Sequence, residues 1–166
     1  MNEILEPTIP ADHLETVILE PVDRSRWPSG PWDQEPDRVE WRHAGFPCLI
    51  VRSRNTGALC GYVGLPPDHP HHGAPYDEVP VDVHGGLTYS DACRGGICHV
   101  PQAGEPADVW WLGFDCAHAW DTLPPHARVG LHASITTYRD VAQVTVWVNE
   151  LAEQLAAAKP EGSPAP

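Results

Sequence analysis

The chain has 166 residues, of which 23 are Asp or Glu and 10 are Lys or Arg, for a formal net charge of −13. This length indicates one domain, and a hydrophobic content of 42% with seven tryptophans is enough to form a core. The acidic balance argues against non-specific nucleic-acid binding, which needs a basic surface, and without an apolar run of about 18 residues no membrane span is predicted.

Residues 1–36 are acidic and rich in proline, and we expect only partial order there. The first 40 residues hold ten acidic side chains that are separated by prolines. The N-terminal residues are acidic where a secretory signal would be basic and then apolar, so we expect a cytoplasmic protein. In that compartment the five cysteines are expected to be reduced thiols.

The next part of the chain predicts β-structure. Residues 39–43 alternate between apolar and polar side chains, as a half-buried strand does. Two apolar runs, 48–51 and 58–64, flank an Arg-Asn-Thr-Gly sequence, and an Asn/Gly turn between apolar runs is typical of a β-hairpin.

The middle of the chain alternates between extended segments and long loops. Residues 81–84 and 87–89 are expected to be extended, and the apolar run 109–114 is expected to be a central strand. Loops are expected at residues 65–80 and 90–107. Loops of this length in a compact domain are usually functional or disordered, and these two flank the histidine-rich part of the chain.

The C-terminal part predicts one long amphipathic helix over residues 138–158. Apolar side chains recur there at spacings of three and four, at Val141, Val144, Val148, Leu151 and Leu155. Thr137 and Asp140 resemble a capping pattern at its start. We therefore predict a single α+β domain over residues 37–158, mainly an antiparallel sheet of four to six strands with this helix across one face, and a disordered tail at 159–166.

A first candidate site is the Asp-Val-His-Gly-Gly sequence at residues 82–86. His84 is a candidate catalytic residue, and Gly85 and Gly86 would let the backbone approach a ligand closely or adopt positive φ in a tight bend. The alternative is a β-bulge with a hydrogen-bonded histidine that has no functional role.

A second candidate site directly follows the apolar run, where side chains leave the core. If this segment is extended, Cys116 and His118 point the same way; if it is helical, Asp115, His118 and Asp121 share one face. Either arrangement pairs a carboxylate with an imidazole, which suits general-base catalysis or metal binding. The alternative is that Asp115 caps a turn and Cys116 is a small buried side chain.

A third candidate is a zinc site. Cys93, Cys98 and His99, together with the more distant Cys116 and His118, have the ligand types of tetrahedral zinc. The Cys-x4-Cys spacing differs from the Cys-x2-Cys of zinc ribbons, so free thiols remain the alternative. Zinc is the one cofactor that the sequence suggests.

Ligand-binding residues are predicted outside these clusters as well. Arg52, Arg54 or Arg94 would meet an anionic group of a ligand, although solvated surface arginines are the commoner explanation. Trp120 lies between His118 and Asp121 in the sequence, and we expect it at a pocket mouth, where an aromatic wall beside polar groups holds small ligands.

Three segments of the sequence resemble a family of small uncharacterised proteins found in bacteria and in their viruses, the phages. They are CGYVG at 60–64, VHGGLTY at 83–89 and WWLGFDCAH at 110–118. The resemblance spans residues 58–121 and implies no established activity. Occurrence in viruses would suit host interaction or counter-defence, for instance by sequestering a signalling nucleotide.

Three functions are consistent with these features. The first is a His-, Asp- and Cys-lined pocket for a small polar molecule, with metal-assisted, hydrolase-like chemistry in which Asp115 or His118 is the base. The second is a binding module without chemistry, for a nucleotide-like ligand. The third is an acidic interaction domain whose first 40 residues engage a basic partner or mimic nucleic acid. A nucleic-acid mimic needs acidic side chains at regular spacing on an ordered surface, and here prolines interrupt them.

Overall fold

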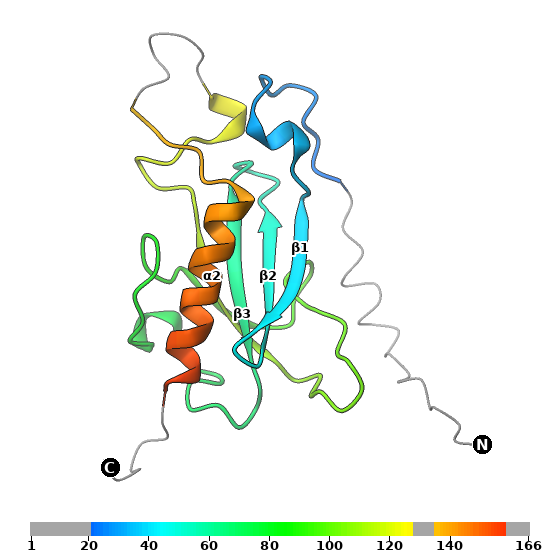
Figure 1. The fold of residues 1–166 in the computed structure, drawn as a ribbon, viewed down its shortest axis with the longest axis vertical. Coiled ribbons are helices and arrows are strands. Elements are labelled where there is room, and N and C mark those ends of the chain that lie inside the picture. The colour runs from blue at the N-terminus through cyan, green and yellow to red at the C-terminus, as the bar shows by residue number, and fades with distance from the viewer. Residues whose placement is uncertain (1–20, 128–134, 159–166) are drawn as a thin grey trace, which may run out of the picture.

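Five antiparallel strands form one sheet in the computed structural model, which describes residues 21–127 and 135–158. The spatial order is β1-β2-β3-β5-β4, so β1 and β4 are the edges. The strands are β1 (Arg38–His43), β2 (Phe46–Arg52), β3 (Leu59–Leu65), β4 (Tyr89–Ala92) and β5 (Trp110–Asp115). The helix α2 (Val141–Ala156) lies across one face of the sheet, and the predicted α+β fold with one C-terminal helix is confirmed (Figure 1).

Short 3-10 helices occur in the connections, and they are η1 (Pro31–Gln34), η2 (Tyr76–Glu78) and η3 (Pro124–His126). None of the helices in the described residues is long and apolar enough to cross a membrane. Residues 1–20, predicted to be partly ordered, and residues 159–166, predicted to be disordered, lie outside the described part of the chain.

The first three strands form two consecutive hairpins. Ala44 and Gly45 join β1 to β2, and both have positive φ, 49° and 88°, as a two-residue hairpin turn of type I′ requires. The predicted hairpin around the Asn/Gly turn is confirmed, because β2 pairs with β3 and the amide of Ser53 donates to the carbonyl of Ala58 at 2.8 Å.

The two faces of the sheet carry separate apolar clusters. The cluster under α2 is the larger, and its buried members from the strands include Cys48, Ile50, Leu59, Val63, Leu65, Leu112 and Phe114. The opposite face buries Leu49, Tyr62, Val109 and Trp111. Gly61 allows α2 to approach the sheet, because a Cβ atom there would lie 2.5 Å from Cγ2 of Val148.

The helix α2 begins slightly later than the sequence predicts. Asp140 is its N-cap, and the Asp140 side chain accepts a hydrogen bond from the amide of Gln143 at 2.8 Å. Thr137 is therefore not the cap; its amide donates to the carbonyl of Trp120 at 2.8 Å. The predicted apolar stripe is confirmed, with full burial at Val144, Val148, Leu151 and Leu155.

Two segments of the middle region differ from the prediction. Residues 81–84 are not in the sheet that the structure describes; Asp82 instead exchanges hydrogen bonds with the Gln154 side chain of α2, at 2.8 and 2.7 Å. Residues 90–92, expected in a loop, belong to the edge strand β4. Ser, Asp and Ala are weak strand formers, so pairing with β5 produces this strand, against the local propensity.

A buried ion-pair network fastens the segment before β1 to the rest of the fold. The Arg52 side chain is fully buried and binds Asp37 Oδ1 at 3.1 Å and Glu35 Oε2 at 3.0 Å. Arg52 also donates to the hydroxyl of Tyr138 at 2.9 Å, and that hydroxyl donates to Glu35. The second oxygen of Glu35 accepts the amide of Val141 at 2.9 Å, which ties the network to the start of α2.

Candidate metal centre

Two histidines and one aspartate from separate turns converge beside the first half of α2. His84 lies in the turn before β4, while His118 and Asp121 lie in the turn after β5. Because β4 and β5 are antiparallel neighbours, the start of β4 lies beside the end of β5. One ligand atom from each of the three side chains lies within 4.8 Å of the other two.

The carboxylate of Asp121 is at the centre of this group. His84 Nε2 lies 2.9 Å from Asp121 Oδ2, and His118 Nδ1 lies 3.1 Å from the same oxygen. Arg139 Nε donates to the other oxygen, Oδ1, at 2.8 Å. The Asp121 side chain has no exposed area, whereas 14% of His84 and 27% of His118 are exposed. The carboxylate is thus buried beneath two imidazoles that reach solvent.

In the turn after β5, Asp115, His118 and Asp121 lie on one side, as predicted for a helical segment. The amide of Asp121 donates to the carbonyl of His118 at 2.9 Å, and the amide of His118 donates back to the Asp121 carboxylate at 3.0 Å. Asp115 Oδ1 lies 4.0 Å from His118 Nδ1, so all three side chains are on one side of the turn. Asp115 also accepts the amide of Ala117 at 2.9 Å, which is the capping role proposed as the alternative.

The orientation of His84 is set by aromatic packing against α2. Its ring stacks on the indole of Trp147, with centroids 4.3 Å apart and planes 6° apart. The guanidinium of Arg139 lies 5.8 Å from the centroid of the same indole. Trp147 therefore contacts both a histidine and the arginine that holds Asp121.

Gly85 is required for the close approach of the two turns. It has a φ of 68°, and a Cβ atom there would lie 2.1 Å from both Cε1 and Nε2 of His118. Gly86 also has positive φ, 80°, but a Cβ atom there would meet nothing within 4 Å. Of the two predicted glycines, Gly85 is the one that shapes the site.

The carboxyl group of Asp121 remains ionised. Burial alone would raise its pKa, but hydrogen bonds from Arg139, His84 and the amide of His118 outweigh burial and lower the pKa to about 2. An ionised carboxylate beside two imidazoles is a donor set for a divalent metal ion.

The distances are near those that such an ion requires. Bonds from zinc to nitrogen or oxygen are about 2.0–2.2 Å, so two ligands at tetrahedral angles on one ion lie about 3.3–3.6 Å apart. The two N···O separations of 2.9 and 3.1 Å are hydrogen-bond distances, and each would lengthen by roughly half an ångström to admit the ion. Three protein ligands would leave at least one position for water or substrate, as in catalytic zinc sites, and two imidazoles with one carboxylate also suit iron(II).

Two residues predicted beside His118 have other environments. Cys116 is buried in the cluster beneath α2, with 2% of its area exposed, and burial raises the pKa of its thiol. It is therefore a core residue, as the alternative interpretation had it. Trp120 is 70% exposed in the turn between His118 and Asp121, so it is accessible to a bound molecule.

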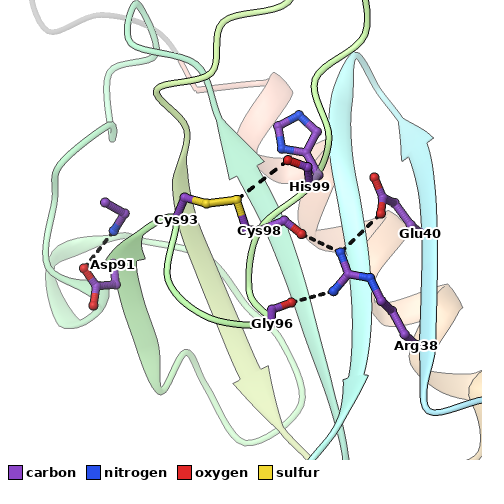
Figure 2. Close-up of a disulfide and its surroundings, with 8 residues drawn as sticks. Arg38, Glu40, Asp91, Cys93, Gly96, Cys98 and His99 are labelled. Atoms are coloured by element: carbon purple, nitrogen blue, oxygen red, sulfur yellow. Dashed lines mark hydrogen bonds and ion pairs between the residues drawn. A yellow bond between two sulfur atoms is a disulfide. The ribbon is translucent and has the colours of Figure 1, made fainter. Parts of the chain in front are cut away.

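The predicted cysteine-rich zinc site is not present in this form of the protein. Cys93 and Cys98 form a disulfide, which contradicts the expectation that all five cysteines are thiols (Figure 2). A disulfide sulfur is not a thiolate, so neither residue can act as a thiolate ligand. His99 is buried on the sheet face opposite α2, with its ring against Trp111 and Nε2 3.8 Å from Glu105.

The predicted arginines lie together, but away from the histidines. Arg52, Arg54 and Arg94 all line one pocket of about 290 Å³ on the face opposite α2. Arg52 is engaged by Glu35 and Asp37, as described above, and the exposed Arg94 pairs with Asp91 at 3.0 Å.

Arg139 and Trp147 contact the site but are not among the residues that the sequence predicts. The only local signals were a charge just before the helix and an aromatic residue beside the apolar stripe, and neither points to a site.

No known family model, curated protein sequence or solved structure matches this chain.

Proposed function

We propose that His84, His118 and Asp121 bind a divalent transition-metal ion, with zinc the best fit, and use it to hydrolyse a small polar substrate. The observation that carries this proposal is the convergence of three ligand atoms within 4.8 Å around a buried, ionised carboxylate. Contacts that orient the ligands support it, because metal-binding side chains normally depend on such partners. Here Arg139 fixes the carboxylate and Trp147 fixes an imidazole.

The surrounding side chains suit a hydrolytic role. A zinc ion would lower the pKa of a coordinated water to about 7. Asp115 is a further carboxylate beside the site, with Oδ1 4.0 Å from His118 Nδ1, and the hydroxyl of Thr88 donates to its Oδ2 at 2.9 Å. Asp115 is one-third exposed, and we expect it to accept a proton from water at the site.

Metal content tests the binding step. The purified protein should carry about one ion per chain by elemental analysis, and zinc should raise the melting temperature of chelator-treated protein. His118→Ala and Asp121→Asn should abolish both effects. His126→Ala, which changes an exposed histidine of η3, is the matched control and should behave as the wild type. No zinc-dependent shift in wild type would overturn the proposal.

Turnover is tested separately with the zinc-loaded protein. Generic phosphate and carboxylate esters should be hydrolysed, and Asp115→Asn should lower kcat while the bound zinc is retained. Zinc binding without hydrolysis of any ester would instead support the binding module, the alternative function without chemistry.

A further inference from the structure

The segment after β4 crosses the sheet face opposite α2 and joins the two edge strands. We call residues 93–105 the strap. Arg38 on β1 donates to the carbonyls of Gly96 and Cys98 in the strap (Figure 2). Arg42, also on β1, pairs with Glu105 at its end. Because β1 and β4 are opposite edges of the sheet, the strap spans its full width.

The strap covers apolar side chains. Ile97 packs against the cluster of this face, and the ring of His99 meets Trp111 edge-on with centroids 5.5 Å apart. Cys98 is 1% exposed and His99 is 4% exposed. The strap therefore shields the second core of the protein from water.

A small hairpin at the start of the strap is closed twice. Arg94 and Ile97 exchange backbone hydrogen bonds at 3.1 and 3.0 Å, and Gly95 has a positive φ of 54° in the turn between them. The Cys93–Cys98 disulfide closes the same hairpin from outside that pair, with Cα atoms 4.8 Å apart (Figure 2). The covalent bond and the backbone bonds thus restrain one short loop.

We infer that the Cys93–Cys98 disulfide is a reversible thiol–disulfide exchange site that locks the strap. Cys93 is half-buried whereas Cys98 is fully buried. An external dithiol would therefore attack at Cys93, the more exposed of the two residues. Its thiolate attacks Cys93 Sγ, the sulfur–sulfur bond breaks, and Cys98 leaves as a thiolate that takes up a proton. The second thiol of the reductant then releases Cys93 and closes the reductant's own disulfide, so two electrons and two protons reach the protein.

The reduced state would be loosened locally. Cys98 Sγ lies 3.7 Å from the carbonyl of His99, which can accept a hydrogen bond from the new thiol. The contacts of Arg38 with the carbonyls of the strap do not depend on the disulfide. What changes is the wall of the 290 Å³ pocket, to which Gly96 and Ile97 contribute. The candidate metal centre is on the other face of the sheet, against α2, so the disulfide lock does not rest on the proposed function.

Counting thiols is the first test. Denatured without reductant, the full-length protein should react with a thiol reagent at three cysteines, Cys48, Cys60 and Cys116, and at five after reduction. Five reactive thiols in the protein as purified under air would overturn the inference.

Hydrogen exchange then tests the lock. Dithiothreitol should speed exchange of the Arg94 and Ile97 amides at least tenfold, with no change in the α2 amides. Cys60→Ser, which removes a thiol lining the same pocket, should respond as wild type does. Cys93→Ser/Cys98→Ser should exchange fast with or without the dithiol. Exchange in wild type that dithiothreitol leaves unchanged would refute the lock without any variant.

Discussion

The imidazole of His84 lies flat on the indole of Trp147, with 4.3 Å between ring centroids and 6° between ring planes. The edge of this imidazole that carries Nε2 points to Asp121, with Nε2 2.9 Å from Oδ2. The His84 ring is therefore held by a stacking contact and by a polar contact at the same time. In this way the packing of α2 on the sheet determines the direction of the nitrogen that is the candidate metal ligand.

Removing the stacking partner should weaken metal binding more than folding. Trp147→Leu leaves His84 without its planar contact, and the loss of a partner that orients a ligand typically lowers metal affinity about 10–100-fold. Trp147→Phe keeps an aromatic ring and should retain most of the affinity. Competition with a chromophoric zinc chelator measures both. Equal affinities for the two variants would show that stacking does not orient His84.

The two glycines after His84 provide a matched pair of substitutions. Gly85→Ala and Gly86→Ala both place a side chain at positive φ, which costs about 1–2 kcal/mol of stability in each. Only the Gly85→Ala methyl group meets the ring of His118, so only this variant should also lose zinc binding. Urea denaturation and zinc titration separate the two effects, and loss of zinc binding in Gly86→Ala would contradict the assignment.

Arg52 should be among the most sensitive positions for stability. Its fully buried guanidinium compensates Glu35 and Asp37, and removing one partner of a buried ion pair typically costs about 3–5 kcal/mol. Arg52→Met should show this loss in urea denaturation, and adding Glu35→Gln should recover part of it, because one uncompensated charge is then removed. A cost below about 1 kcal/mol would show that the pair is not compensating.

Asp37 should contribute to loss of stability in acid. Burial raises its pKa, but the amide of Val22 and the guanidinium groups of Arg24 and Arg52 outweigh burial, so the pKa is lowered overall. A carboxyl with a lowered folded pKa stabilises the fold above its unfolded pKa of about 3.9, and this stability is lost as the pH falls toward the folded pKa. Asp37→Asn should therefore flatten the pH dependence of the unfolding free energy below about pH 4. The exposed Asp68→Asn is the control and should leave that dependence unchanged.

The free thiols should be unreactive while the protein is folded. Burial raises the pKa of Cys48 to about 12 and that of Cys60 to about 11, and it also raises the pKa of Cys116. At pH 8 the thiolate fraction of Cys60 is then about 100-fold below that of an ordinary cysteine. Iodoacetamide labelling followed by mass spectrometry should find these three sites modified only after denaturation. Rapid labelling of the native protein would contradict this.

The parts of the fold that were predictable are those with a local signal. The hairpin of β2 and β3 is marked by its Asn/Gly turn, and α2 is marked by its apolar stripe at helical spacing. The strand β4 has no such signal in Ser90, Asp91 and Ala92, and exists because β5 offers it an edge to pair with. The disulfide was missed because the compartment inferred from the N-terminus predicted reduced cysteines.

The site was predictable only in part, for the same reason. The spacing of Asp115, His118 and Asp121 follows from their order in one turn. His84 joins them through the pairing of β4 with β5, which no local pattern encodes. Arg139 and Trp147 contribute through the way α2 lies on the sheet, so only tertiary structure identifies them.

The bonds from Arg38 to the strap also bear on how the protein folds. They join Arg38 on β1 to strap residues 58 and 60 positions further along the chain, so they close a large loop of chain. Such closure is entropically costly until the intervening hairpins have formed. We therefore expect the strap to dock after the folding transition state, so that weakening Arg38 accelerates unfolding and leaves the folding rate nearly unchanged.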